Sequence, residues 1–483
     1  MSHKGKAVMV LGTTSGAGKS WLATALCRWY ARQGLKVAPF KAQNMSNNAR
    51  VVPGLNGLMG EIGSAQYFQA LAARRVPEVR MNPVLLKPEA DTQSQVVVLG
   101  EVDAELSRMP WRERSALLKP RARAALHELL RENDVVVIEG AGSPAEINLA
   151  NSDYVNLGMA RDARAACLLV TDIDRGGAFA HLYGTHQLMP EDVRAQVKGF
   201  VLNRFRGDAG LLSPGPEQLQ HLTGVPTIAT LPMWRGHGLP EEDGVFDDAS
   251  TGSSGGLHIA VIAYPRLSNL DEFQPLRQLP GVRLSWAREP RDVQGADWIV
   301  LPGSKSTAAD LAWLRAQKLD LAINAHRGRV LGICGGLQML GEALIDTHGV
   351  DGNAPGLGLL PLVTVFETEK LLSSTTLHFA ATDGPWAALA GVQAEGYEIR
   401  HGRTRPHAGL PPPQIALRNA AGEAIGWQAG RVLGVYAHGL FEQPAVLQAL
   451  FGEKGRPLEA VFDGLADFID LHFQPGKIAS LID

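Results

Sequence analysis

The sequence has few cysteines and no long apolar run. Three cysteines in 483 residues, Cys27, Cys167 and Cys334, are too few for a disulfide framework and are typical of a reducing compartment. No uninterrupted apolar stretch approaches the length of a membrane-spanning helix, and residues 1–6 lack the apolar block of a signal peptide. We therefore expect a cytoplasmic protein without a membrane partner.

Excess charge of either sign is also missing. The formal net charge is −3 at pH 7, and charged residues make up 20% of the chain against 45% hydrophobic residues. Such a balance creates no global field that favours nucleic acid or an anionic membrane, so nucleic acid is not expected as a partner. A chain of this length is too long for one hydrophobic core, which predicts two or three domains.

What the sequence does contain is a glycine-rich loop between a predicted strand and a predicted helix. Residues 12–20 read Gly-Thr-Thr-Ser-Gly-Ala-Gly-Lys-Ser, after the apolar run 7–11 and before apolar residues at helical spacing. This is the context of a phosphate-binding loop, whose backbone N–H groups and helix start face phosphate oxygens. We expect Lys19 to reach the outer phosphates of ATP and the Ser20 hydroxyl to ligate Mg²⁺. The other expected nucleotide contacts come from Gly12, Thr14, Ser15, Gly16 and Gly18.

Strand-like apolar runs alternate with helical patterns through the first half of the chain. The runs cover residues 36–40, 134–138, 165–171, 198–202 and 225–231. This alternation predicts an α/β fold with a parallel sheet covered on both faces, and ligands at the carboxyl ends of its strands. Lys41, Glu139, Asp172 and Asn203 stand at such ends. Glu139 is placed to hold Mg²⁺ beside the loop, and the amide of Asn203 can read a nucleotide base.

A glycine- and serine-rich segment, residues 247–256, has the composition of a flexible linker. We place a phosphate-loop domain before it, over residues 1–246. A second alternating series predicts another α/β domain over residues 257–450, and residues 451–483 are expected to form a C-terminal helical tail.

The second half contains a strand, a tight turn and a helix centred on Cys334. Residues 330–340 read Val-Leu-Gly-Ile-Cys-Gly-Gly-Leu-Gln-Met-Leu, with glycines where side chains would clash, as in a nucleophile elbow. A helix N-terminus stabilises a thiolate, and a thiol nucleophile needs a base, for which His438 is the candidate. Backbone N–H groups near Gly303 and Gly335 are candidates for an oxyanion hole.

The Gly-Ile-Cys-Gly-Gly turn with a downstream histidine resembles the triad-type glutamine amidotransferases, and the whole chain resembles the cobyric acid synthase family. The resemblance runs essentially end to end. The phosphate loop, with Thr13 at the usual first glycine and Gly12 one residue earlier, resembles that of the dethiobiotin synthetase and MinD-like group. The other matching motifs are residues 40–45, 81–87, 139–148, 172–177, 203–206, 301–305, 396–399 and 436–439.

The resemblance implies a P-loop synthetase domain of the dethiobiotin synthetase/MinD-like type, followed by a class I glutamine amidotransferase-like domain. The implied activity is ATP- and glutamine-dependent amidation of the b, d, e and g carboxylates of adenosylcobyrinic acid a,c-diamide. Lys19, Ser20, Glu139 and Mg²⁺ would stabilise the phosphoryl group transferred to a carboxylate.

In the implied second half-reaction, ammonia is released from glutamine through a thioester on Cys334, with His438 as base and acid. By resemblance to dethiobiotin synthetase, Lys41 is a second phosphate-side lysine and Asn203 reads adenine. Many triad amidotransferases carry His-x-Glu, but here Gly439 and Leu440 follow the histidine. Glu398 and Glu442 are candidates for the third member, and a dyad without a carboxylate is the alternative.

Two rival interpretations stay open. A cobyrinic acid a,c-diamide synthase would have the same two domains and a different choice of carboxylates, which the middle motifs disfavour. A MinD-like ATPase switch with an inert second domain is disfavoured by the presence of both Cys334 and His438. The acidic tail at residues 462–472 also argues against binding to an anionic membrane.

Overall fold

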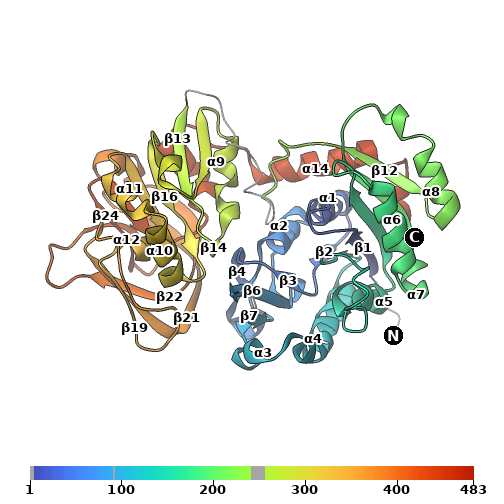
Figure 1. Ribbon diagram of the computed structural model, residues 1–483, viewed down its shortest axis with the longest axis horizontal. Coiled ribbons are helices and arrows are strands. Elements are labelled where there is room, and N and C mark those ends of the chain that lie inside the picture. Colours follow the sequence, from blue (N-terminus) through green and yellow to red (C-terminus); the bar gives the residue numbers. More distant parts are fainter. Residues whose placement is uncertain (1–4, 91–92, 241–255) are drawn as a thin grey trace. The chain divides into compact units, whose positions relative to one another are not determined.

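The computed structural model describes residues 5–90, 93–240 and 256–483 (Figure 1). The described chain forms two compact units, and neither is one continuous stretch of sequence. The first unit combines Met1–Ser46, Val52–Asp243 and Pro457–Asp483, and the second combines Asn47–Val51 and Gly244–Arg456. Most of the predicted linker, residues 247–255, lies outside the described residues.

The first unit is built on a six-stranded sheet in which every neighbouring pair is parallel. The strand predictions for the first half of the chain are confirmed, with ends that differ by a few residues. In spatial order the strands are β12 (Thr227–Pro232), β11 (Val197–Phe205), β10 (Ala166–Asp172), β1 (Lys6–Gly12), β9 (Val135–Glu139) and β2 (Val37–Phe40).

Helices bury both faces of this sheet, because alternate residues of each strand enter two different cores. On β1, Val8 and Val10 belong to one core, and Met9 and Leu11 belong to the other. Fully buried strands of this kind are what a doubly covered parallel sheet requires. The first core includes α1 (Lys19–Arg32), α2 (Ser64–Ala72), α14 (Leu458–His472) and α15 (Lys477–Ser480), and the second includes α4 (Trp111–Glu132), α5 (Met159–Ala163), α6 (Ala178–Leu188), α7 (Glu191–Arg194) and α8 (Gly215–Thr223).

Between β2 and α4 the chain forms two smaller sheets that the alternation of strands and helices does not indicate. One has four strands, and the other is a pair. The four-stranded sheet contains β3 (Asn44–Met45), β6 (Val84–Ala90), β7 (Gln93–Val98) and β8 (Glu101–Val102), followed by α3 (Ala104–Arg108), and the pair is β4 (Ala49–Pro53) with β5 (Met59–Gly63). Both lie in the stretch that follows Lys41 in the sequence.

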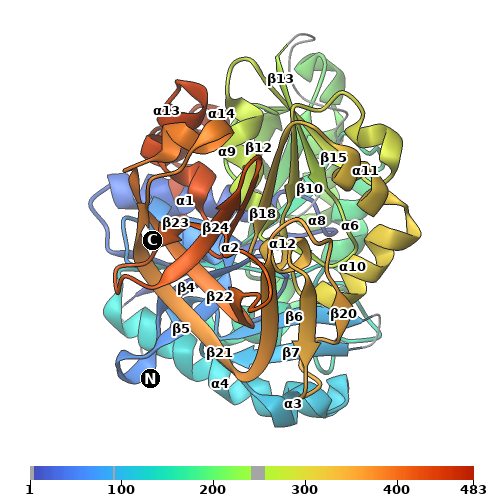
Figure 2. The ribbon, with the colours of Figure 1, turned by 90° about the vertical axis from the view of Figure 1, so that its left-hand side faces the viewer.

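The second unit contains a mixed sheet of eleven strands. Its first five strands are parallel, and the long antiparallel ribbon of β21 and β22 extends it (Figure 2). In spatial order the strands of the whole sheet are β15 (Val282–Ala287), β13 (Leu257–Ile262), β16 (Trp298–Leu301), β18 (Arg329–Ile333), β25 (Val432–Val435), β24 (Ala424–Ala429), β23 (Gln414–Arg418), β21 (Leu362–Phe379), β19 (Ala343–Asp346) and β20 (Ala354–Pro355). The remaining strand, β22 (Gln393–Pro406), pairs with β21.

Within the described part of the second unit, five α-helices and a short strand pair accompany this sheet. The helices are α9 (Gln274–Gln278), α10 (Thr307–Ala316), α11 (Leu319–Ala325), α12 (Gly335–Leu340) and α13 (Pro444–Phe451), and the pair is β14 (Leu267–Ser268) with β17 (Gly303–Ser304). None of the helices in the described ranges is both long and apolar enough to cross a membrane.

The last long helix, α14, packs on α1 and so belongs to the first unit (Figure 1). Phe462 is fully buried in the core that α1 shares with the central sheet. At the edge of this contact, the buried guanidinium of Arg28 pairs with Glu459 at 2.6 Å and with Asp463 at 2.7 Å. The predicted C-terminal tail is therefore grouped, from Pro457 onward, with the phosphate-loop unit.

Replacing Phe462 with alanine is expected to destabilise the first unit by about 3–5 kcal/mol, because a fully buried aromatic side chain leaves a cavity. Leu471, which is 77% exposed on the same helix, provides the matched control, and Leu471→Ala should change stability by about 0.5 kcal/mol or less. The stability of each variant is measured by hydrogen exchange of the α1 amides under mild denaturant. Equal loss of protection in the two variants would contradict the packing of α14 on α1.

Candidate functional site

In the first unit, the loop of residues 12–20 joins β1 to α1 and surrounds the Lys19 side chain. Nζ of Lys19 donates hydrogen bonds to the carbonyl oxygens of Thr14, at 2.9 Å, and Gly142, at 3.0 Å. Gly18 has a φ of +97°, and a Cβ there would lie 2.1 Å from Nδ2 of Asn203. Only glycine fits this position, so the loop and the end of β11 approach each other directly.

The unusual threonine of the loop has a structural partner. Thr13 is buried, and its Oγ1 lies 2.9 Å from Oγ1 of Thr171, near the carboxyl end of β10. The side chain that replaces the usual glycine therefore ties the loop to a neighbouring strand. Thr14 and Ser15, by contrast, are exposed at the outer turn of the loop.

Glu139, at the end of β9, is the centre of a buried polar cluster. Its Oε1 accepts a hydrogen bond from Ser20 at 2.8 Å and an ion-pair hydrogen bond from Nζ of Lys41 at 2.7 Å. Its Oε2 accepts from Gln69 at 2.5 Å and Gln66 at 3.3 Å, both on α2. The structure thus brings together Ser20, Lys41 and Glu139, three side chains that the sequence predicted for one site.

Burial would raise the pKa of Glu139, but its partners reverse the effect. The charge and hydrogen bond of Lys41, with the hydrogen bonds of Gln69 and Ser20, hold the pKa of this carboxyl below its usual value. Glu139 is therefore an anion although its side chain is 1% exposed. A fixed buried anion beside a phosphate loop suits the binding of a cation that also contacts phosphate.

Asn203 and Asp172 occupy the carboxyl ends of the next two strands. Nδ2 of Asn203 donates to the carbonyl oxygen of Ala17 in the loop, at 2.9 Å. Asp172 pairs with Arg204 at 3.0 Å and with Arg175 at 3.5 Å. The ends of β1, β9, β10 and β11 therefore all contribute polar groups around the loop, as the parallel-sheet rule predicts.

In the second unit, Cys334 stands at a strained turn between β18 and α12. Its backbone has φ 51° and ψ −105°, a conformation that side chains rarely adopt. The glycines around it are required by space, because a Cβ at Gly332 would lie 2.5 Å from Leu340 and one at Gly336 would lie 1.9 Å from the carbonyl oxygen of Leu301. This is the geometry of a nucleophile elbow, which presents Cys334 at the carboxyl end of a parallel strand.

The imidazole of His438 is buried between Cys334 and a carboxylate that the sequence analysis did not single out. Nδ1 of His438 lies 3.2 Å from Oε1 of Glu272, whose other oxygen accepts a hydrogen bond from N–H of Gly439 at 3.1 Å. Burial alone would lower the pKa of His438. The charges of Glu272 and Cys334, and hydrogen bonds to both, outweigh burial and raise this pKa to about 10.

The two predicted oxyanion-hole glycines adjoin this cluster. A Cβ at Gly303 would lie 2.9 Å from Cε1 of His438, and a Cβ at Gly335 would lie 2.8 Å from the backbone nitrogen of Ser304. The strand pair that carries Gly303 is fixed by buried Asp310, which accepts a 2.6 Å hydrogen bond from the Ser304 hydroxyl. The backbone near both glycines therefore lies beside the Cys334–His438 pair.

The two carboxylates proposed for the third triad position have other partners. Glu398 accepts a hydrogen bond from Arg400 at 2.7 Å, and Glu442 pairs with Arg50. Glu272 lies 166 positions before His438, in the 3₁₀ helix η5 (Leu270–Phe273). The only sequence signal was a pair of acidic residues, Asp271 and Glu272, soon after the first strand of the second unit.

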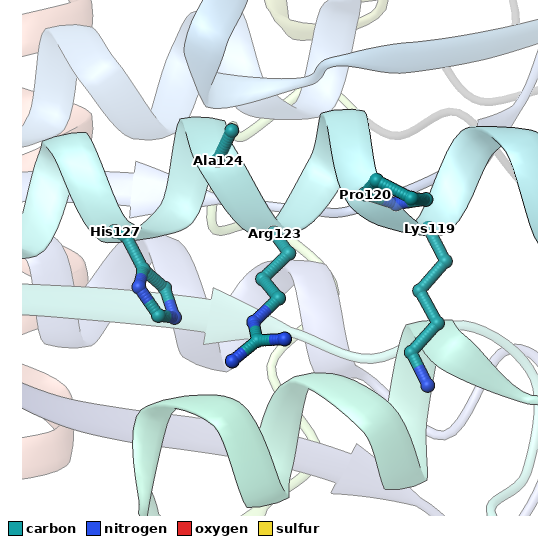
Figure 3. Close-up of a pocket in the computed structure, with 5 residues that line it drawn as sticks. All are labelled: Lys119, Pro120, Arg123, Ala124 and His127. Carbon is teal, nitrogen blue, oxygen red and sulfur yellow. The ribbon is translucent and has the colours of Figure 1, made fainter.

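A surface pocket of about 340 Å³ lies elsewhere on the first unit, along α4 (Figure 3). Its lining residues are Lys119, Pro120, Arg123, Ala124 and His127. Figure 3 shows Lys119, Arg123 and His127 pointing to the same side of the helix. Arg123 lies 3.4 Å from Asp162 of α5. None of the predicted site residues lines this pocket.

Comparison with known proteins agrees with the two-unit arrangement. Residues 8–236 match the family described as the CobQ/CobB/MinD/ParA nucleotide binding domain, and residues 258–446 match the CobB/CobQ-like glutamine amidotransferase domain. The cobyric acid synthase of Methylibium petroleiphilum is 70% identical, with 99% of this chain and 97% of that protein covered. That of Leptothrix cholodnii is 69% identical with the same coverage.

Among solved structures, a crystal structure of a glutamine amidotransferase is similar to 44% of this chain and to 100% of its own, with 18% identity and a TM-score of 0.30. A score this low supports no argument. The family matches and the curated relatives, which span both units, are the informative comparisons.

Replacing Glu272 with glutamine is expected to lower the pKa of His438 from about 10, because the amide keeps the shape but removes the charge that stabilises the imidazolium. The imidazolium form of His438 is present below this pKa. In the variant the ring would therefore lose its proton at a lower pH than in the wild type. NMR titration of histidine-labelled protein measures the change. Glu398→Gln, which alters a buried carboxylate paired with Arg400, is the control and should leave the titration of His438 in place. Identical titrations in wild type and Glu272→Gln would contradict the assignment.

Proposed function

The chain belongs to the cobyric acid synthase family, and on that basis we propose how its two units share the ATP- and glutamine-dependent amidation of a corrinoid polycarboxylate. The substrate of the family is adenosylcobyrinic acid a,c-diamide, whose b, d, e and g carboxylates become amides. The observation that supports the division is that each unit has its own buried reactive cluster. One is centred on Glu139 beside the phosphate loop, and the other on Cys334 and His438.

The first unit activates the carboxylate. We assign ATP binding to the loop residues Gly12–Ser20, with Lys19 placed to move from its carbonyl partners to the outer phosphates. Lys41 supplies a second positive charge on the phosphate side, held in position by Glu139. Transfer of the terminal phosphoryl group to a substrate carboxylate gives an acyl phosphate, whose developing charge these cations stabilise.

The donor set beside the loop fits Mg²⁺. The Ser20 hydroxyl and the ionised Glu139 carboxylate lie 2.8 Å apart, and Mg²⁺ in nucleotide sites takes few protein ligands beside phosphate oxygens and water. No group of three or more His, Cys, Asp or Glu side chains suited to a metal occurs in the described ranges, so an all-protein cage is not what these residues form. When bound, the ion would neutralise phosphate charge.

The base-reading role of Asn203 is part of the same proposal. Its side chain lies at the end of β11 and already contacts the loop through the carbonyl oxygen of Ala17. An amide offers both a donor and an acceptor, which is what recognition of the adenine edge requires. We assign adenine recognition to Asn203 on this placement.

The second unit supplies ammonia. The thiolate of Cys334 attacks the side-chain amide carbon of glutamine, and His438 gives its proton to the departing nitrogen, which leaves as ammonia. Backbone N–H groups near Gly303 and Gly335 are assigned to the oxyanion of the tetrahedral intermediate. Water, deprotonated by His438, then hydrolyses the glutamyl thioester to glutamate. Glu272 keeps the ring oriented through both steps and stabilises its protonated form before the first step and after the second.

Incubation with ATP, Mg²⁺, glutamine and the a,c-diamide tests the function directly. Mass spectrometry should show successive products that each gain one amide, ending four amides above the starting diamide. The physical reason is a single phosphate loop serving a substrate with four reactive carboxylates. If the a,c-diamide stayed unchanged, while a parallel incubation with the unamidated acid gave products ending at the diamide, the chain would be an a,c-diamide synthase instead.

Cys334→Ala is expected to abolish amidation from glutamine and to spare amidation from ammonium salts, because only glutamine hydrolysis needs the thiolate. Lys19→Ala should abolish both, since losing one charge contact at the transferred phosphoryl group costs about 3 kcal/mol or more of barrier, roughly a hundredfold in rate. Amide formation with each nitrogen source provides the comparison. Equal failure of folded Cys334→Ala with both sources would show that the units do not divide the reaction in this way.

A further inference from the structure

We propose that Arg50, which lies 221 positions before its partner Asp271, is a positioning residue for the base His438; this rests on the glutaminase role proposed above. The chain segment Asn47–Val51 belongs to the second unit, although Ser46 and Val52 on either side of it belong to the first. A short piece of the N-terminal half thus completes the surroundings of the glutamine site.

Arg50 is buried, with 2% of its side chain exposed, and its guanidinium has three partners. It forms an ion pair with Asp271, and its Nη1 donates to Oε2 of Glu442 at 2.8 Å. Its central carbon lies 5.2 Å from the ring centroid of Tyr397, within the range of a cation–π contact. One planar cation therefore joins residues from three separate elements.

Each partner of Arg50 adjoins His438 or a segment that contacts it. Asp271 precedes Glu272 within η5, so fixing one carboxylate restrains the turn that carries the other. Glu442 ends the 3₁₀ helix η8 (Leu440–Glu442), which starts two positions after His438. The ring of Tyr397 stacks on that of His438, with centroids 5.4 Å apart and planes at 25°.

The backbone around Arg50 strengthens the same arrangement. Oδ1 of Asn48 accepts a hydrogen bond from N–H of Leu270 at 3.0 Å, at the start of η5. The carbonyl oxygen of Ala49 accepts from Nδ2 of Asn269 at 2.8 Å, and Nδ2 also donates to the Tyr397 hydroxyl at 2.7 Å. The segment is therefore hydrogen-bonded to both the turn of Glu272 and the ring that covers His438.

The charges explain why an arginine is needed there. Asp271 and Glu272 are buried, Glu442 is half-buried beside them with 13% of its side chain exposed, and Arg50 pairs with Asp271 and Glu442. Without it, buried negative charges would face each other unpaired, which is strongly unfavourable. The η5 turn would then shift toward solvent, and Glu272 would no longer orient the imidazole of His438 toward Cys334.

The test measures glutamine hydrolysis and ammonia-dependent amidation in the full-length enzyme. Arg50→Met should lower kcat for glutamine hydrolysis about a hundredfold with KM changed by less than about threefold, because the defect lies in proton transfer and not in binding. Arg50→Lys keeps the charge but not the planar guanidinium group, so its kcat should be about tenfold higher than that of Arg50→Met. Amidation from ammonium salts should stay within about twofold of wild type in both variants.

Arg329→Met is the matched control, because Arg329 also lies over an aromatic ring of the second unit, 4.8 Å from Trp298, but at the start of β18 and not at its Cys334 end. Wild-type kcat in Arg50→Met, an equal loss in Arg329→Met, or an equal loss of ammonia-dependent amidation would each overturn the role of Arg50. If wild-type enzyme hydrolysed no glutamine at all, the proposed function would fall as well. Should Arg50→Met not fold, a kcat for Arg50→Lys equal to wild type overturns the proposal.

Discussion

A carboxylate leaves water for a protein interior only where cations and hydrogen-bond donors replace its hydration, and this constraint shapes both units. In the first, Glu139 stays ionised because Lys41, Ser20 and two glutamines surround it. In the second, Glu272 faces the imidazole of His438, whose pKa Glu272 and Cys334 together raise to about 10. Parallel sheets bring these groups together at the carboxyl ends of their strands. The chemistry therefore depends on the sheet topology, which in turn requires apolar strands that are buried on both faces.

The sequence predicts most of what depends on local order along the chain. The apolar runs that form β1, β9, β10 and β18 are short and bounded by polar or glycine-rich turns. The sequence therefore predicts that they are strands and where they begin and end. The loop before α1 and the turn at Cys334 are readable for a related reason. In both, glycines mark positions where another part of the protein occupies the space of a side chain, as the approach of Asn203 to Gly18 shows.

What the sequence does not predict depends on contacts between distant positions. Glu398 and Glu442 were the candidates for the carboxylate that orients His438. In the structure, however, Glu398 pairs with Arg400 and Glu442 pairs with Arg50. Glu272 reaches His438 because the segment after β13 lies beside the end of β25, and locally the sequence offers only the acidic pair of which it is part. The ribbon of β21 and β22 and the sheet around β6 were missed similarly, because antiparallel pairings carry no helix between strands to reveal them.

The return of α14 to the first unit has a consequence for synthesis on the ribosome. The apolar face of α1 is made early, but Phe462 and its neighbours, which complete that core, are made only after the second unit. Domains generally fold in the order in which they are made. Here the unit made first keeps part of its core exposed while the second is produced, so the nascent chain is a target for chaperones during that time. A chain that ends before α14 lacks part of the core of its nucleotide-binding unit.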